Sequence, residues 1–221
     1  MKKTTLSLLT LILFIWIFIW IYNQWEKAIN IEEIKQSIVI IIPEKDLIEY
    51  NKNPEWIFQK KESGWVGSWF FVSKDGKIIT AKHIVPNKEE TYKVITQNNK
   101  KYNAKVTYQD NQKDIAFLKI NTKEKIIPLK ITQESKKWEE VITFWTDTAT
   151  QKTTHHYGQI VDTEKKWETL SHLIQISSPL TPWFSWWPVV NKQWKVIWIN
   201  YALYKWQSLI QPLDSFNYQV K

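Results

Sequence analysis

The chain has 221 residues, 43% of them hydrophobic, which allows one compact domain with a sizeable core and a short extension. The formal net charge is +8 and all 30 basic residues are lysines. Since lysine reads phosphates and base edges less specifically than arginine, a nucleic-acid partner is not expected. The absence of cysteine excludes disulfides and cysteine-ligated zinc. The chain holds 15 tryptophans but only 4 glycines, whereas glycine usually makes up about 7% of a protein.

The first predicted element is an apolar helix, Leu6–Tyr22, which carries no charge and has a length at the short end of what spans a bilayer. No small-residue cleavage site follows this run, so we expect an uncleaved anchor rather than a signal peptide that is removed. Lys2 and Lys3 precede the run and should stay in the cytoplasm. Residues 1–24 are therefore predicted to be a cytoplasmic tip and a transmembrane helix of the cell membrane. The rest of the chain should be periplasmic or at the cell surface.

Residues 25–33 are predicted to be a short polar linker that runs into a helical turn. After them the pattern changes to short runs rich in Ile, Val, Phe and Thr, which are typical of β-strands. An Asp-Gly dipeptide between two of the runs, in SKDGK, indicates a hairpin. Many short strands without a long helical period predict an all-β domain, either a sandwich or a pair of barrels. The runs are, in chain order, SIVIIIP, SWFFVS, KIITA, YKVITQ, AKVTYQ, DIAFLKI, EVITFW, GQIVD, HLIQIS, WPVVN, KVIWINYAL and SLIQPL.

Three residues with complementary chemistry lie beside predicted strands. His83 follows the run KIITA, Asp114 begins the run DIAFLKI, and Ser185 precedes the run WPVVN. A hydroxyl becomes a good nucleophile when an imidazole takes its proton, and the imidazole needs a carboxylate to fix its tautomer. The order His, Asp, Ser along the chain is that of chymotrypsin-type enzymes, not of subtilisins or α/β-hydrolases. Asp110 is a second candidate acid, disfavoured because IAFLK does not follow it.

The segments around these residues resemble those of HtrA/Deg-like trypsin-fold serine proteases. SGWVGSWFFVSKDGKIITAKHIV is similar to the first-barrel segment with its Thr-Ala-x-His turn, and DIAFLKI is similar to the segment that carries the acid. SPLTPWFSWWPVVNKQWKVIWIN is similar to the nucleophile segment. The resemblance implies two antiparallel six-stranded β-barrels, at residues 34–120 and 121–221, with the active site in the cleft between them. No PDZ domain is expected, because the sequence stops after the second barrel.

The resemblance also assigns catalytic roles. Ser185 would attack the peptide carbonyl, His83 would act as general base and then general acid, and Asp114 would orient His83. The backbone N–H groups of Trp183 and Ser185 would form the oxyanion hole.

Substrate binding is assigned in the same way. The bottom of the primary pocket would be built around Pro179 and Leu180. Asn200, Tyr201 and Ala202 would pair in β fashion with the substrate backbone. Because no acid is expected in that pocket, cleavage should follow small or medium aliphatic residues rather than Lys or Arg.

Tryptophan repeatedly stands where this family has glycine. Glycine in place of Trp183, Trp186 and Trp187 would turn TPWFSWWPVV into TPGFSGGPVV, the nucleophile motif without strain. Family positions and turn chemistry also ask for glycine at Trp65, Trp69, Trp194, Trp198 and Trp206. We interpret the tryptophans as UGA codons, which some bacterial lineages read as glycine and a common alternative translation table reads as tryptophan. The tryptophans and glycines together come near the usual glycine share.

We therefore expect a membrane-anchored bacterial serine endopeptidase that faces the cell envelope. It should hydrolyse unfolded or regulatory proteins through an acyl-enzyme, with no cofactor or metal, and a homo-oligomer is a further partner to consider. One alternative is a catalytically inactive trypsin-fold protein that binds peptides. Another is a structural envelope protein with a coincidental triad match. His155 and His156 are adjacent, but no third ligand is evident, so an exposed loop bordering the active site is expected there rather than a metal site.

Overall fold

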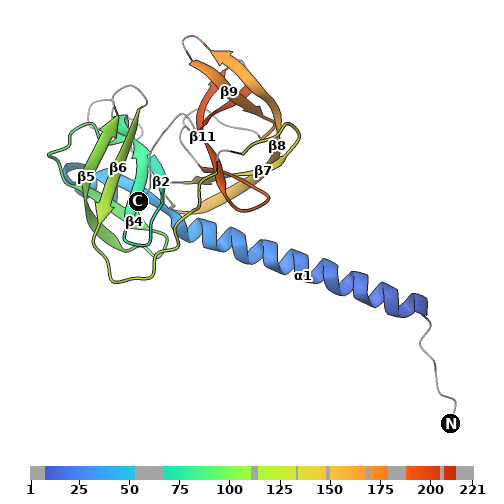
Figure 1. Ribbon diagram of the computed structural model, residues 1–221. Coiled ribbons are helices and arrows are strands. Elements are labelled where there is room, and N and C mark those ends of the chain that lie inside the picture. The colour runs from blue at the N-terminus through green and yellow to red at the C-terminus, as the bar shows by residue number, and fades with distance from the viewer. Residues whose placement is uncertain are drawn as a thin grey trace.

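The computed structural model describes residues 8–52, 67–110, 114–132, 134–147, 150–167, 170–178, 188–204 and 207–212. Within these ranges one long helix precedes twelve β-strands, which form two barrels side by side (Figure 1). Each of the twelve runs predicted from the sequence corresponds to one of these strands. The prediction of a mostly β domain with two barrels is thus confirmed.

The long helix α1 spans Leu8–Ser37 and contains neither proline nor glycine that would break it. Its first half projects from the barrels, and the large apolar side chains of Leu11–Tyr22 are between 43% and 71% exposed. Its last turns pack on the barrels through the buried side chains of Ile31 and Ile34. Residues 25–33, predicted to be a linker, are instead part of α1, because this packing stabilises the helical conformation. No helix in the described ranges combines the length and the hydropathy that crossing a membrane requires.

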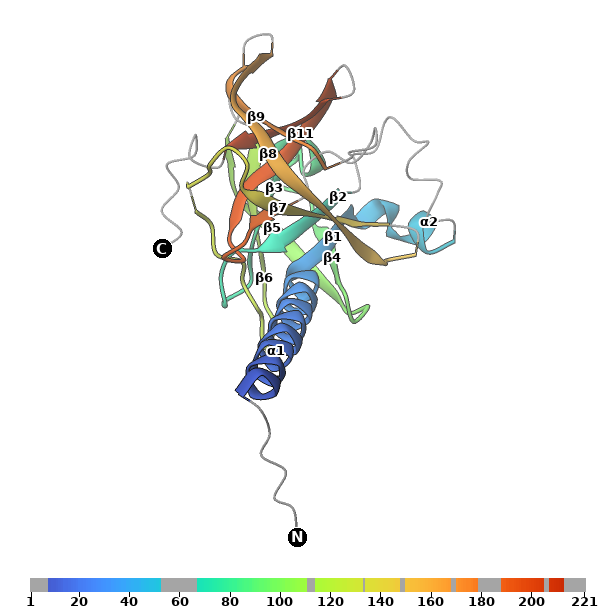
Figure 2. The same cartoon turned by 90° about the vertical axis from the view of Figure 1, so that its right-hand side faces the viewer.

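The first barrel has the strand order β1-β2-β3-β6-β5-β4, and all its neighbouring strands are antiparallel. Strand β1 follows α1 directly and is buried at all six positions, as expected for a continuous run of Ile and Val. Figure 2 shows α1 entering the molecule at this barrel, beside β1 and β4, with the second barrel above it. The strands are β1 Ile38–Pro43, β2 Gly67–Phe71, β3 Lys77–Ala81, β4 Tyr92–Thr96, β5 Lys101–Asp110 and β6 Ile115–Ile120. Between β1 and β2 lie the short helices η1 (Glu44–Asp46) and α2 (Leu47–Lys52), and η3 (Lys82–Ile84) follows β3.

The second barrel has the order β10-β11-β12-β9-β8-β7, again antiparallel throughout. Its interior is a small cluster of aliphatic side chains, centred on Ile160, Val189 and Ile197. The outer side chains Ile142 and Phe144 belong to the larger cluster that fills the first barrel, so the two barrels share one packed interface. The strands are β7 Glu140–Thr146, β8 Thr153–Trp167, β9 Leu170–Ile176, β10 Pro188–Asn191, β11 Val196–Tyr204 and β12 Gln207–Pro212.

Two hairpin turns, one in each barrel, have the same construction. Between β2 and β3, the N–H of Gly76 donates to the carbonyl of Ser73, and the Ser73 side chain accepts the N–H of Lys77. Between β10 and β11, the N–H of Trp194 donates to the carbonyl of Asn191 over 3.0 Å. The Asn191 side chain accepts the next N–H, that of Lys195, over 3.1 Å.

Candidate active site

His83 lies on the short helix η3, which interrupts the chain immediately after β3. The buried side chains of Ala81 and Ile84 hold the two ends of this turn in the core. The N–H of Lys82 donates to the carbonyl of Asp114 over 3.0 Å, so the turn is tied to the start of β6. The local fold thus brings the His83 and Asp114 backbones together before their side chains interact.

The Asp114 carboxylate holds His83 through two contacts. One oxygen, Oδ2, lies 2.6 Å from His83 Nδ1, and the other, Oδ1, accepts the His83 backbone N–H over 2.9 Å. The backbone of Asp114 has φ of 50°, a left-handed conformation that aspartate tolerates better than most residues. Both side chains are about one-third exposed, at 37% for His83 and 36% for Asp114. The pair is therefore fixed in geometry but accessible to a substrate.

This geometry determines the tautomer of the imidazole. An ionised carboxylate only accepts hydrogen bonds, so Nδ1 of His83 carries the hydrogen that it donates to Asp114. The other nitrogen, Nε2, then carries the lone pair of the neutral ring, and it can take a proton. Asp114 rather than Asp110 makes this contact, in line with the interpretation of the IAFLK segment.

Three of the predicted site residues, Leu180, Trp183 and Ser185, fall in residues 179–187 and lie outside the described part of the chain. The structure describes what flanks them. The buried Ser178 hydroxyl lies 2.8 Å from that of Thr143 on β7. At the other end, Pro188 pairs with Ile199 of β11.

Strand β11 carries the predicted substrate-binding residues Asn200, Tyr201 and Ala202. It pairs with β10 only as far as Ile199, and from there to Tyr204 it pairs with β12 alone among the described strands. The register against β12 shifts between Asn200 and Ala202, as in a β-bulge. Beyond β10, one edge of β11 can therefore receive an additional strand.

His155 and His156, predicted in an exposed loop, lie instead on strand β8, because they pair in register with Phe144 and Thr143 of β7. The His155 ring contacts those of Phe144 and Tyr157, with the Tyr157 ring edge-on at 5.4 Å. Nε2 of the exposed His156 accepts the indole N–H of Trp145 over 3.3 Å. Among the described residues, no three or more His, Asp or Glu side chains are arranged to hold a metal ion.

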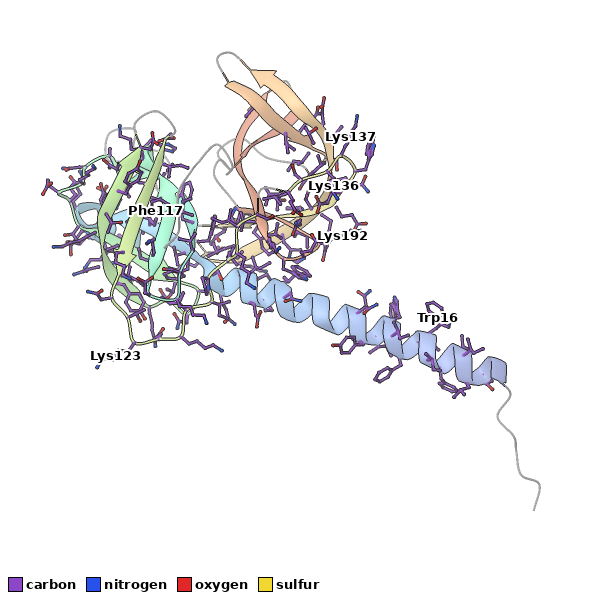
Figure 3. The ribbon with its side chains drawn as sticks, in the orientation of Figure 1. Trp16, Phe117, Lys123, Lys136, Lys137 and Lys192 are labelled. Carbon is purple, nitrogen blue, oxygen red and sulfur yellow. The ribbon has the colours of Figure 1, made fainter. Side chains whose placement is uncertain are left out.

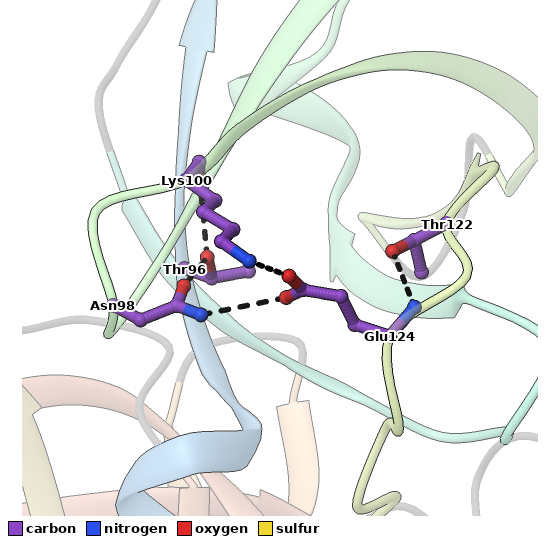
Figure 4. A network of polar contacts seen from close by, with 5 residues as sticks. All are labelled: Thr96, Asn98, Lys100, Thr122 and Glu124. Carbon is purple, nitrogen blue, oxygen red and sulfur yellow. Dashed lines mark hydrogen bonds and ion pairs between the residues drawn. The ribbon is translucent and has the colours of Figure 1, made fainter.

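The far end of the first barrel contains a cavity of about 450 Å³, lined by Gln36 of α1 and by the β4–β5 turn. Its polar rim forms an internal network in which Glu124 binds both Lys100 and Asn98 (Figure 4). The charges of Lys100 and Glu124 thus neutralise each other at this rim. The His83–Asp114 pair is at the other end of the barrel, where Ala81 pairs with Ile115.

Sequence reasoning missed two residues that hold the chain just after His83. Gln109 on β5 donates through Nε2 to the carbonyl of Val85. The hydroxyl of Tyr92 on β4 donates to the carbonyl of Asn87 over 2.9 Å and accepts the N–H of the same residue over 3.2 Å. Neither residue belongs to a recognisable motif, so only the three-dimensional structure identifies them.

Comparison with known proteins locates similarity in the same region. Residues 67–199 match the family described as Trypsin-like peptidase domain. Serine protease HTRA1A of Danio rerio is 39% identical over 71 residues, which are 32% of this chain and 15% of that protein. The "Probable periplasmic serine endoprotease DegP-like" of Bartonella henselae is 36% identical over 70 residues, which are 32% of this chain and 14% of that protein. The matches thus cover about one-seventh of these relatives.

The fold is similar to that in the crystal structure of Deg5. The TM-score is 0.66 at 16% sequence identity, over 87% of this chain and 91% of that chain. At this identity the similarity concerns the fold, which agrees with the strand order described above.

Proposed function

Because the chain belongs to the trypsin-like peptidase domain family and is HtrA/Deg-like, we propose that it is a membrane-anchored serine endopeptidase facing the cell envelope. The observation that carries the proposal is the contact between His83 and Asp114. It supplies an imidazole with its lone pair on Nε2 and a carboxylate that stabilises the charged ring.

In this mechanism Nε2 of His83 takes the proton of the Ser185 hydroxyl as the oxygen attacks the peptide carbonyl. The backbone N–H groups of residues 183 and 185 bind the oxyanion that forms. His83 then gives its proton to the leaving amine, the peptide bond breaks, and an ester to Ser185 remains. Water, deprotonated by His83, hydrolyses the ester and restores the serine.

The substrate in this proposal is an extended polypeptide. The edge of β11 beyond Ile199 has main-chain groups available for a substrate strand, which favours unfolded segments over folded domains. Leu180 at the base of the primary pocket would select small or medium aliphatic side chains. Two relatives are named as a serine protease and a serine endoprotease, which supports a polypeptide substrate.

The direct test is a fluorophosphonate probe, which reacts with an activated serine. Labelling and hydrolysis of an unfolded protein are expected, and Ser185→Ala should abolish both while leaving the fold intact. Hydrolysis by the Ser185→Ala variant would reject the mechanism. Absence of labelling in the native protein would favour the inactive peptide-binding alternative.

We further propose that the tryptophans at family glycine positions are glycine in the cell, as an active oxyanion hole requires. Trp138 and Trp194 support this proposal, because their φ angles of 69° and 60° lie in the left-handed region that favours glycine. A side chain with a Cβ is strained there. Trp194 occupies the position in the β10–β11 turn that Gly76 occupies in the β2–β3 turn. Gly76 is also left-handed, with φ of 93°.

The anchor belongs to the same proposal. The apolar half of α1 is exposed on all its sides, and Figure 3 shows Trp16 standing away from the helix. A helix that is apolar all round is stable when lipid or protein covers it completely. The predicted span, Leu6–Tyr22, begins before the first described residue.

Fractionation tests the anchor. The full chain is expected in the membrane pellet and resistant to alkaline carbonate, whereas a chain starting at residue 25 should be soluble. Protease added to intact cells should degrade the barrels once the outer layer is permeable. Recovery of the full-length protein in the soluble fraction would contradict the anchor but not the peptidase activity.

A further inference from the structure

The main chain on the C-terminal side of His83 is held from two directions. Val85, two residues after His83, is fully buried, and its carbonyl accepts a hydrogen bond from the side chain of Gln109. Asn87, two residues further on, is held at both its N–H and its carbonyl by Tyr92. Together with the bond from Val85 N–H to the Lys82 carbonyl, these contacts fix the exit of the turn that carries the imidazole.

Gln109 connects the two halves of the catalytic pair. It lies on β5, opposite Ala116 of β6, five residues before Asp114 in the chain. Its bond to the Val85 carbonyl therefore joins the histidine-bearing turn to the strand that leads to Asp114. A shift of β5 relative to this turn would move the imidazole away from its carboxylate.

Tyr92 holds the next part of the same loop from inside the barrel. Its side chain is fully buried, and burial raises the pKa of its phenol, so the hydroxyl keeps the proton that it donates to Asn87. The ring is wedged among core side chains and cannot follow a movement of the loop. The loop is consequently attached to the most rigid part of the barrel.

We propose that Gln109 and Tyr92 are positioning residues that keep the His83 imidazole aligned between Asp114 and the nucleophile. The inference rests on the proposed peptidase function and deepens it. Both side chains bind main-chain groups of the loop after His83 and not the imidazole itself, so their effect is on the alignment of reacting groups. A misplacement of about 1 Å in an active site can lower the rate by about 100-fold.

The test compares two substitutions that remove similar bonds. Gln109→Met removes the bond to the Val85 carbonyl. Gln97→Met removes a matched bond, from Gln97 Nε2 to the Ile38 carbonyl at 3.3 Å, beside the cavity at the far end of the same barrel. Both substitutions are made in the full-length chain. The parent is the version that hydrolyses peptide, with either tryptophan or glycine at the family glycine positions.

Gln109→Met should lower kcat by about 10-fold with KM nearly unchanged, since alignment and not binding is affected. Gln97→Met should keep kcat within about twofold of the parent while losing similar thermal stability. Tyr92→Phe should lower kcat by less than Gln109→Met, because the ring still packs in the core. All rates are expressed per folded molecule, counted by the fraction resistant to proteolysis.

Equal kcat values for Gln109→Met and Gln97→Met would overturn the inference, as would a loss that appears only in KM. If Gln109→Met does not fold, Gln109→Glu, which keeps the length of the side chain and removes the donor, is measured against the same criterion. A parent that neither hydrolyses peptide nor reacts with the fluorophosphonate contradicts the proposed function itself. An active parent with an unaffected Gln109 variant contradicts only the positioning role.

Discussion

The turns β2–β3 and β10–β11 share two corresponding hydrogen bonds, but they differ in the residue that adopts the left-handed conformation. The residue that must be left-handed is Gly76 in the first barrel and Trp194 in the second. A Cβ on Gly76 would lie 2.6 Å from the carbonyl oxygen of Ile120, so this turn has no room for a larger residue. The contrast extends to the two barrels. Residues 38–120 contain three glycines and three tryptophans, whereas residues 121–221 contain one glycine and nine tryptophans. The left-handed position of this turn is filled by glycine in the first barrel and by a strained residue in the second, as expected if position 194 is glycine in the cell, as proposed above.

The largest expected effect tests the part of the site that belongs to the first barrel. Asp114→Asn should lower kcat by about 10⁴-fold, because an amide can hold His83 in the wrong tautomer and cannot stabilise its charged form. Asp110→Asn is the matched control four residues away and should leave kcat within about twofold of the parent. Steady-state hydrolysis of an unfolded protein measures both. Similar losses in the two variants would remove the assignment of Asp114.

The next effect concerns tryptophans at family glycine positions, most of which lie in the second barrel. A gene with glycine at positions 65, 69, 183, 186, 187, 194, 198 and 206 should give about 100- to 1,000-fold higher kcat/KM than the printed sequence, since an oxyanion-hole donor is restored. Mass spectrometry of the native protein is an independent measurement. The tryptic peptide Val196–Lys205 should carry glycine at position 198. Equal activity of the two genes, or the mass of tryptophan in that peptide, would show that both barrels are built as printed.

Single substitutions at left-handed positions should change stability in opposite directions in the two barrels. Gly76→Ala should lower the free energy of unfolding by more than about 1 kcal/mol, because of its φ and the nearby Ile120 carbonyl. Trp138→Gly should raise it by about 1 kcal/mol, since Trp138 is 64% exposed and loses little packing. Urea denaturation measures both. A stability loss in Trp138→Gly would mean that tryptophan is accommodated at this φ.

The smallest expected effect is a difference between the two hairpins in how their stability depends on pH. A hydrogen bond from Lys119, with another from Ser73, lowers the pKa of Asp75 from 3.8 to about 2. The stability that this carboxylate contributes is therefore complete above pH 3.8 and is lost as the pH falls through 2. The corresponding residue of the β10–β11 turn is Gln193, which does not titrate. Amide exchange should show the β2–β3 turn loosening between pH 4 and 2, and Asp75→Asn should remove this dependence.

The strands and the contact between His83 and Asp114 were predictable because their signals are local. A short apolar run such as IVIIIP favours a buried strand over other structures. The residues around His83 and Asp114 form distinctive short sequence motifs. The helical conformation of residues 25–33 was not, because it depends on Ile31 and Ile34 meeting a core assembled from distant strands. The role of Gln109 could not be predicted from the sequence. A glutamine in a strand gives the same sequence pattern whether its side chain faces water or binds a carbonyl 24 residues away.

Helix α1 passes into strand β1 without a connecting loop, and the last helical residue, Ser37, binds both the Glu33 and the Ile127 carbonyls through its hydroxyl. A helix of 30 residues is about 45 Å long. Because no loop separates it from β1, the helix forms a rigid lever arm attached to the first barrel. Whatever holds the apolar end of the lever also fixes the direction in which the His83 turn faces. Tilting or rotating that end would reorient the cleft as a rigid body, so the geometry of attachment would select which polypeptides reach it.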